Sequence, residues 1–211
     1  MRDDAAKNTR AALVVHPLTP SRWHDLETIF NARGCAVARG CWCMYYRRSG
    51  AQPAPKGGSR REDSRAALRR LASADPPPGL IGYRGKTPVG WISLGPRADF
   101  AKLARSPVMK PVDAAPVWSI VCFVVPAEHR GQGVARALLD GAIAWAASRG
   151  ATLLEAYPVD KAQRAADDTM WFGTQSMFDA AGFTEVARRK PTRPVMRLAV
   201  ASHAGQPGGG N

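Results

Sequence analysis

The most distinct hydrophobic pattern in the chain is a run of nine nearly all apolar residues, Val117–Val125. The run is rich in Val and Ile and too short to span a bilayer, so it predicts a strand that is covered on both faces. Pro126 ends this strand, because proline cannot continue a central strand. An Ala- and Leu-rich stretch then follows a glycine-containing turn and stops at Gly150, a residue type that commonly ends helices. The pattern therefore predicts a strand, a turn and a long helix in succession.

The turn between this strand and this helix carries the main chemical signal of the chain. Its sequence is Arg-Gly-Gln-Gly-Val-Ala, from Arg130 to Ala135. The first amides of a helix have no hydrogen-bond partner within the helix, and the helix dipole favours negative charge beside them. Glycines at 131 and 133 would let a large anion approach those amides. The turn therefore predicts a phosphate-binding site.

Shorter patterns predict the remaining elements and a mixed α/β sheet. Their order is β-α-α-β-β-β-α-β-α-β-β, with about six to seven strands flanked by helices, which is not a doubly wound sheet. Residues 35–46 are apolar and aromatic, and periodicity does not decide between core and pocket lining. We expect additional strands at Ala11–Val15, Leu80–Arg84, Val89–Leu94, Thr152–Tyr157, Phe183–Arg189 and Val195–Val200, and additional helices at Arg22–Ala32, Arg60–Ser73 and Gly173–Ala181.

Length and composition predict a single folded domain with a basic surface. The 211 residues are 45% hydrophobic, which suffices for a core in residues 11–200, between a flexible segment 1–10 and a flexible Gly-rich tail 201–211. Thirty Lys and Arg against 17 Asp and Glu give a net charge of +13. Such a surface attracts phosphates, nucleic acid or anionic lipid, although many basic proteins bind none of these. The sequence shows neither a signal-peptide core nor a run of about 18 apolar residues, so we expect a cytoplasmic protein.

Three of the four cysteines lie close together in the sequence, at 35, 41 and 43. A zinc site here would need a fourth ligand, for which His16 and His24 are the nearby choices, and its spacing would differ from the usual paired cysteines. We therefore predict reduced cysteines and no metal. The fourth, Cys122, lies in the predicted core strand and is expected to be a buried apolar side chain.

Comparison with known nucleotide-binding patterns narrows the identity of the phosphate. No Walker A motif is present, and Arg136 occupies the third glycine position of a Rossmann turn. Arg130-x-x-Gly133-x-Ala135 instead resembles the (Q/R)-x-x-G-x-(G/A) signature of the GCN5-related N-acetyltransferase (GNAT) family. The preceding strand, the following helix and the Gly-Phe pair at 182–183 extend this resemblance over about 117–183, and element order extends it over 11–200.

The resemblance implies an acetyltransferase domain that moves acetyl from acetyl-CoA, its acyl-donor co-substrate, to a primary amine. The acceptor would be a small molecule or a peptide, attacking the thioester directly. We expect a monomer or homodimer with no membrane partner, and a nucleic-acid partner is the less favoured alternative. In the family the turn binds the CoA pyrophosphate and a core-strand amide stabilises the oxyanion. Carried over by position, the acyl-CoA site consists of Phe123, Val124, Val125, Arg130, Gly131, Gln132, Gly133, Val134, Ala135 and Arg136.

The chain departs from the family pattern at the proton-transfer groups. The tyrosine that commonly acts as the acid four positions before the Gly-Phe pair is replaced by Phe178. We predict Glu155 as the general base and Tyr157 as the acid in its place, because alternate strand residues share a face. An ion-paired strand carboxylate and a packing aromatic are the alternatives for these two residues.

Positively charged and aromatic residues suggest where the rest of the substrates would bind. The CoA 3′-phosphate needs cations, for which Arg130, Arg136, Lys161 and Arg164 are candidates. An aromatic acceptor pocket for an apolar or planar amine would draw on residues that could equally form core: Trp42, Tyr45, Tyr46, Trp91, Trp171 and Phe172.

Two other functions remain open from the sequence. The missing family tyrosine would suit a catalytically silent acyl-CoA sensor. The basic segment Arg47–Arg70 would suit a nucleic-acid-binding protein, although it carries no known motif and no interleaved aromatics.

Overall fold

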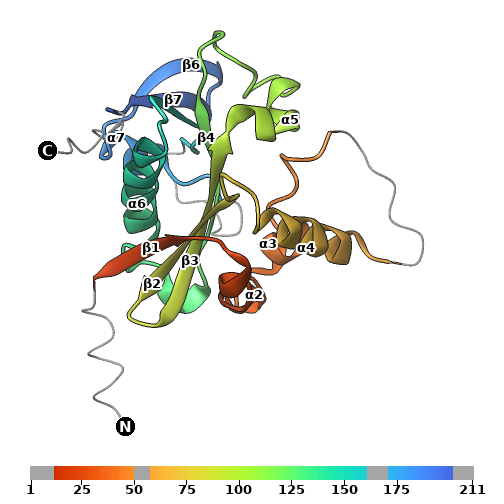
Figure 1. Ribbon diagram of the computed structural model, residues 1–211. Helices are drawn as coiled ribbons and strands as arrows, with labels where there is room; N and C mark the ends of the chain where they lie inside the picture. The colour runs from red at the N-terminus through yellow and green to blue at the C-terminus, as the bar shows by residue number, and fades with distance from the viewer. Residues whose placement is uncertain (1–11, 50–57, 161–170, 202–211) are drawn as a thin grey trace, which may run out of the picture.

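The computed structural model describes residues 12–49, 58–160 and 171–201. In these ranges the chain forms one seven-stranded sheet in the order β1-β2-β3-β4-β5-β7-β6 (Figure 1). Neighbouring strands are antiparallel except for the parallel pair β4–β5. The mixed sheet predicted from the sequence is confirmed. Its strands are β1 Leu13–Pro17, β2 Gly79–Arg84, β3 Thr87–Pro96, β4 Trp118–Val124, β5 Leu153–Ala156, β6 Thr184–Lys190 and β7 Arg193–Ala199.

Helices lie on both faces of this sheet, with α6 on one side and α2, α3 and α4 on the other (Figure 1). Segment 35–46, which the sequence left undecided, contains the short helix α3, so three helices instead of two separate β1 from β2. The helices are α2 Trp23–Asn31, α3 Ala36–Cys41, α4 Arg60–Leu71, α5 Ala101–Ala104, α6 Val134–Ser148 and α7 Gln175–Asp179, with 3-10 turns η1 Pro20–Arg22, η2 Arg97–Asp99 and η3 Ala127–His129. No described helix has the length and apolarity to cross a membrane.

Two hydrophobic clusters cover the two faces of the sheet. Leu80 and Ile92 belong to the cluster under α6, whereas their strand neighbours Ile81 and Trp91 belong to the cluster under α2 and α4. Adjacent residues of a strand point to opposite faces, so a sheet covered on both sides needs continuous apolar runs. This is the physical reason for the uninterrupted hydrophobic strands in the sequence.

The start of α4 and the end of α3 have distinct backbone features. Helix α4 begins at a capping box, in which the Ser59 hydroxyl accepts from the Glu62 amide and the Glu62 carboxylate accepts from the Ser59 amide. Trp42 is the C-cap residue of helix α3, and both Trp42 and Cys43 have positive φ angles, 47° and 52°. Non-glycine residues rarely adopt this left-handed conformation, and each such residue costs about 1–3 kcal/mol.

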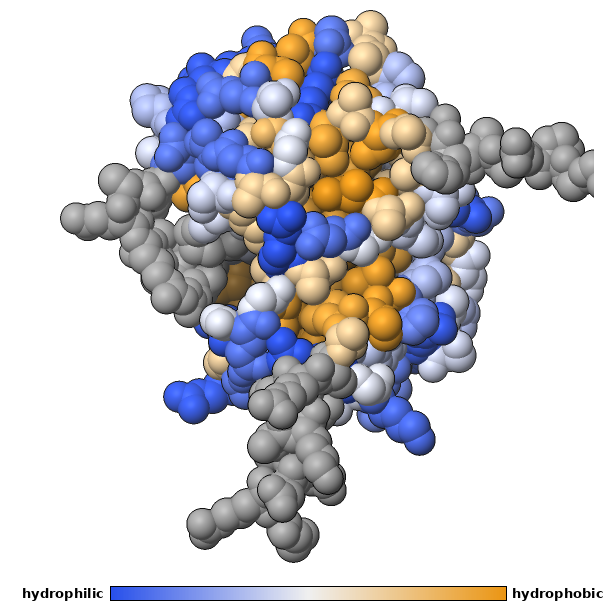
Figure 2. Space-filling view, turned by 90° about the vertical axis from the view of Figure 1, so that its left-hand side faces the viewer, coloured by the Kyte–Doolittle hydropathy of each residue, from blue (hydrophilic) through white to orange (hydrophobic). Residues whose placement is uncertain are grey.

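The outer surface on the α6 side is chemically mixed. Figure 2 shows hydrophilic residues in separate clusters between hydrophobic areas on this face of the molecule. Hydrophilic residues therefore do not form one continuous area there.

The predicted terminal segment 1–10 and the tail from residue 202 onward lie outside the described residues.

Two glycine-to-alanine changes test how closely α6 packs on the sheet. A Cβ at Gly141 would lie 2.3 Å from Val15 Cγ2, while a Cβ at Gly40 in α3 would meet nothing within 4 Å. We expect Gly40→Ala to raise the free energy of unfolding by about 0.5–1 kcal/mol, since alanine is the better helix former. Gly141→Ala should lower it by about 1–3 kcal/mol through overpacking. Urea unfolding measures both, and equal stabilisation by the two changes would mean that β1 yields to the new methyl group.

Candidate active site

Strand β4 is irregular where the sheet opens. Ser93 of β3 lies opposite Cys122, and the next residue, Leu94, lies opposite Ile120, so Val121 is the extra residue of a bulge. The parallel pairing with β5 reaches Ile120 and does not extend further along the described strand. The part of β4 beyond Ile120 therefore turns its outer edge toward a pocket instead of a neighbouring strand.

The glycine turn places the N-terminus of α6 beside this open edge. Gly131 and Gly133 have φ angles of 70° and 76°, in the left-handed region that favours glycine. Gly133 is the residue before Val134, where α6 begins, and it supplies no side-chain cap. A Cβ at either glycine would meet nothing within 4 Å. The turn at the N-terminus of this 15-residue helix thus borders open space, as an anion-binding site requires.

A pocket of about 580 Å³ joins the edge of β4 to the turn. Nine of the ten residues predicted for the acyl-CoA site line it, Gln132 being the exception. These nine are Phe123, Val124, Val125, Arg130, Gly131, Gly133, Val134, Ala135 and Arg136. The remaining walls come from the α2–α3 region, from β4 and from the segment after residue 170: Gly34, Cys35, Val37, Ala38, Cys41, Cys43, Tyr45, Tyr46, Val121, Cys122, His129, Trp171 and Gly173.

The two arginines of the turn play different parts. Arg130 donates through Nε to the Val125 carbonyl at 3.0 Å and through a terminal nitrogen to the Gly34 carbonyl at 2.7 Å. It therefore holds the turn against the end of β4 and against the α2–α3 loop. Arg136 uses Nε to bind both carboxylate oxygens of Asp140, at 2.8 and 3.0 Å, and its side chain is 42% exposed. Its guanidinium lies on the pocket wall, in a position suited to a ligand phosphate.

Gln132 is the predicted site residue that does not line the pocket. The Gln132 side chain donates to the Glu128 carbonyl at 2.7 Å, within the turn itself. Lys161 and Arg164, which were predicted as candidates for the 3′-phosphate, lie outside the described residues.

Glu155 lies in a buried ion-pair network and does not line the pocket. Its side chain is 0% exposed and forms a salt bridge with Arg97, and its second oxygen accepts from Arg197 Nε at 2.8 Å. Arg197 also binds Asp113 through both terminal nitrogens, at 2.6 and 3.0 Å. A carboxylate held by two arginines and shielded from solvent is placed to stabilise the sheet, so this geometry gives no support to its predicted role as base.

Tyr157 belongs to the same network. It follows the last residue of β5, and its hydroxyl donates to Glu155 at 2.6 Å while accepting from Arg97 at 2.6 Å and bonding Ser119 at 2.9 Å. Burial, followed by the nearby Glu155 carboxylate, raises the pKa of the phenol well above its usual range. The structure therefore brings Glu155 and Tyr157 together as predicted, but away from the residues that line the pocket.

The predicted aromatic acceptor pocket is only partly present. Trp42 and Trp91 are fully buried and do not line the pocket; Trp42 stacks on Phe30 at 4.7 Å between ring centroids. The sequence left acceptor pocket and core open for these two residues, and tertiary packing uses both as core. Phe172 is also absent from the lining, whereas Tyr45, Tyr46 and Trp171 do line it. Phe178 is fully buried against Phe123 and Phe183, so it supplies packing.

Several pocket residues were not predicted to carry chemistry. His129 lines the pocket directly before the turn, and Tyr46 lines it from the α3 side. Burial, with a smaller contribution from Tyr45, raises the pKa of the Tyr46 phenol to about 12. Cys41, Cys43 and Cys122 complete this wall. The sequence shows these residue types, but nothing in their spacing along the chain indicates that β4 and α3 bring them together.

The described residues contain no group of three or more His, Cys, Asp or Glu placed to hold a metal ion. Among them, the pocket lining also includes no carboxylate. The charge at the pocket is therefore set by the arginines and by the α6 N-terminus, both of which favour a negatively charged ligand.

A sheet opened between two parallel strands, with an uncapped helix N-terminus facing the gap, defines a protein suited to a phosphate-bearing ligand. A family model described as the acetyltransferase (GNAT) family matches residues 43–170, which is more than half of the chain. The chain therefore belongs to the GNAT acetyltransferase family, and the resemblance seen in its sequence is confirmed.

Solved structures agree with this fold at low sequence identity. An acetyltransferase from Thermus thermophilus is 18% identical, with a TM-score of 0.50 over 90% of this chain and 97% of its own. The PaiA N-acetyltransferase from Thermoplasma acidophilum, solved in complex with coenzyme A, is 15% identical, with a TM-score of 0.51 over 90% and 99%. The GNAT domain of S. lividans PAT is 20% identical, with a TM-score of 0.52 over 90% and 97%. No curated protein matches the chain.

Replacing Glu155 tests whether its network is structural. Glu155→Gln would leave Arg97 and Arg197 without their buried counter-charge, so we expect a loss of roughly 3–5 kcal/mol in the free energy of unfolding. Glu185→Gln is the matched control, since that carboxylate pairs with Arg188 at the surface and should change stability little. If Glu155→Gln keeps wild-type stability but abolishes acetyl transfer, Glu155 acts in catalysis after all.

Proposed function

We propose that this protein transfers an acetyl group from acetyl-CoA to a primary amine of a small molecule or peptide, by direct attack on the thioester. The observation that carries the proposal is the meeting of two features in one pocket. These are the uncapped N-terminus of α6 at Gly133 and the open edge of β4 beyond Ile120. The first suits the pyrophosphate of the donor, and the second suits its thioester arm.

In this proposal the pyrophosphate of acetyl-CoA lies against the amides from Gly131 to Ala135. The two left-handed glycines allow close approach, and the helix dipole adds to the attraction. Arg136 supplies a cation to one of the phosphates, whereas Arg130 acts indirectly by holding the turn in place. The positive end of the pocket thus recognises the donor.

The tetrahedral intermediate requires a hydrogen-bond donor for its oxyanion, and we assign this role to the Val125 amide. The Phe123 amide already donates to the Trp171 carbonyl at 2.6 Å, which shows that it points away from β3. Alternation along a strand turns the Val124 amide toward β3 and the Val125 amide toward the pocket side. Among the three predicted donors, Val125 is therefore placed to receive the oxyanion.

The acceptor end of the pocket favours a neutral, apolar amine. Its walls are formed by Val37, Ala38, Tyr45, Tyr46 and Trp171, and the described lining contains no carboxylate that would attract an ammonium group. A polyamine or another strongly cationic acceptor would therefore find no counter-charge among the described residues at this end. An amine that is bound largely deprotonated needs only a water molecule to carry its proton away.

We propose Tyr46 as the acid that protonates the departing CoA thiolate. Because its pKa is raised to about 12, the phenol stays protonated at neutral pH and can donate. It lies in the same pocket as the β4 edge, which Tyr157 does not. Tyr46 would thus replace the tyrosine that the family has where this chain has Phe178.

A catalytically silent acyl-CoA sensor is the second candidate function. It is favoured by Phe178 and by the lack of a carboxylate in the described pocket lining, since neither feature assists proton transfer. A thiol-release assay with acetyl-CoA and a panel of uncharged and cationic primary amines separates the two functions. Thermal stabilisation by acetyl-CoA without turnover on any amine would favour the sensor.

The donor site can be tested with two matched glycine changes. Gly133→Ala and Gly150→Ala both place a side chain at a positive φ, 76° and 82°, and both new Cβ atoms enter open space. Only Gly133 lies in the pocket, so we expect Gly133→Ala to weaken acetyl-CoA binding by at least about tenfold. Gly150→Ala, at the other end of α6, should bind as the wild type does. Isothermal titration measures both, and unchanged affinity in Gly133→Ala would argue against the proposed donor site.

The acid can be tested with two neighbouring tyrosines. We expect Tyr46→Phe to lower kcat by about a hundredfold, a common effect of losing a general acid, while acetyl-CoA affinity stays unchanged. Tyr45→Phe is the control, because Tyr45 is 57% exposed and should tolerate the change. A raised pKa keeps Tyr46 protonated as pH increases, so wild-type kcat should not fall before about pH 11 through loss of this proton. Full kcat in Tyr46→Phe would mean that the thiolate leaves without this acid.

A further inference from the structure

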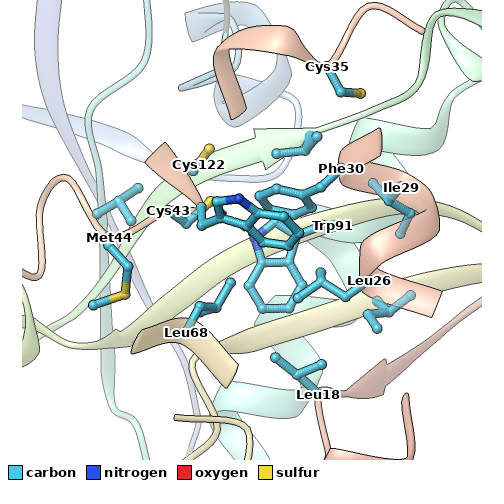
Figure 3. Close-up of a cluster of buried hydrophobic side chains, with 14 of the residues drawn as sticks. Leu18, Leu26, Ile29, Phe30, Cys35, Cys43, Met44, Leu68, Trp91 and Cys122 are labelled. Atoms are coloured by element: carbon cyan, nitrogen blue, oxygen red, sulfur yellow. Dashed lines mark hydrogen bonds between the residues drawn. The ribbon is translucent and has the colours of Figure 1, made fainter. Parts of the chain in front are cut away.

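The proposed acetyl transfer gives no role to two thiols in the wall of the pocket. Cys43, just after α3, and Cys122, in β4, are 5% and 9% exposed, and both line the pocket. Both side chains lie close to Trp91 (Figure 3), and a side-chain hydrogen bond joins the two thiols. Two cysteines far apart in the chain thus form a contacting pair at an accessible cavity.

Tertiary packing holds Cys43 in this position. Both Trp42 and Cys43 have left-handed backbone angles, and the fully buried indole of Trp42 is fixed by stacking on Trp23 and Phe30. The Trp91 indole nitrogen also donates to Cys43 Sγ at 3.3 Å. An uncommon backbone conformation at two successive bulky residues is maintained only where the surroundings impose it, and here it accompanies a sulfur held by the Trp91 indole.

The two sulfurs differ in protonation. Hydrogen bonds from Cys122 and Trp91, helped by the nearby charge of Arg47, outweigh burial and lower the pKa of Cys43. The pKa of Cys122 is raised by its hydrogen bond to Cys43 and by burial. Cys41, the third thiol of this wall, is kept protonated by burial, which raises its pKa to about 12. Cys43 is therefore the nucleophile of the group and Cys122 its adjacent partner.

We propose that Cys43 and Cys122 form a dithiol modification site that reacts with the disulfides of small thiols and closes into a disulfide. Because these sulfurs lie beside Phe123 and Val124, closure also alters the wall where the thioester arm would lie. We expect oxidation to weaken acetyl-CoA binding, a consequence that rests on the proposed function.

The thiol–disulfide exchange needs only the two protein thiols, the small disulfide and water. The Cys43 thiolate attacks one sulfur of the small disulfide, a sulfur–sulfur bond to the protein forms, and one small thiolate leaves. That thiolate takes the proton of Cys122, whose sulfur then attacks Cys43 and displaces the second small thiolate, which is protonated from water. The two protein thiols are oxidised to one disulfide, and the small disulfide is reduced to two thiols.

Native full-length protein treated with oxidised glutathione tests this site. We expect loss of two of the four free thiols, a Cys43–Cys122 cross-link in non-reducing peptide mapping, and reversal by dithiothreitol. Cys122→Ser should instead accumulate a glutathione adduct on Cys43, because the partner that displaces it is missing. Cys35→Ser is the matched control, since Cys35 lines the same pocket and its sulfur faces the Arg33 carbonyl at 4.0 Å; this variant should react as the wild type does.

The mapping of the wild type needs no variant to fold, so the proposal stays testable if Cys122→Ser is unstable. Unreacted Cys43 in the native protein, or a cross-link between Cys41 and Cys43, would overturn it. Thermal stabilisation of the reduced protein by acetyl-CoA is measured separately. Failure of that stabilisation counts against the proposed function, whereas failure of the cross-link counts against the dithiol site alone.

Discussion

The loss of strand pairing along β4 is the constraint on which the rest of this molecule depends. A bulge at Val121 and the end of the β4–β5 ladder at Ile120 leave the distal half of β4 with an open edge inside the protein. On this edge the Phe123 amide donates to the Trp171 carbonyl, and a ligand can supply partners for other backbone groups beside it. The N-terminus of α6 lines the same pocket, so one break in the sheet brings the proposed anion site next to backbone groups of β4.

Where β4 and β5 are still paired, a buried cluster of charged side chains holds the strands together. Glu155 on β5, Arg197 on β7 and Arg97 after β3 meet in a buried cluster that ties together strands on both sides of the parallel pair. Two arginines and the Tyr157 phenol bind the buried Glu155 carboxylate. Removing any one of them would leave this carboxylate with a lost hydrogen bond in the interior. The cluster thus holds the strands together where they are paired, while the bulge lets them separate beyond.

Particular residues show which features of the fold and of the site could be predicted from the sequence. Hydrophobic runs and turn residues predicted the seven strands and the long helix, because periodicity and glycine chemistry act locally. The turn from Arg130 to Ala135 was recognisable because anion binding uses the backbone of consecutive residues. Glu155 and Tyr157 were predicted to act on substrates, and the structure buries them with Arg97, which is 58 positions from Glu155. Trp42 could have lined the acceptor pocket or formed core, and stacking places it in the core.

The sequence by itself determined the strands, the long helix, the family and the glycine turn proposed to bind the donor phosphates, since each of these is encoded in neighbouring residues. Only the tertiary structure decided which side chains share the pocket. Tyr46, Cys43 and Cys122 come from segments far apart in the chain, and the bulge at Val121 exists only in the pairing of two strands. Long-range packing sets such contacts, and it leaves no periodic or local signal along the chain from which they could be predicted.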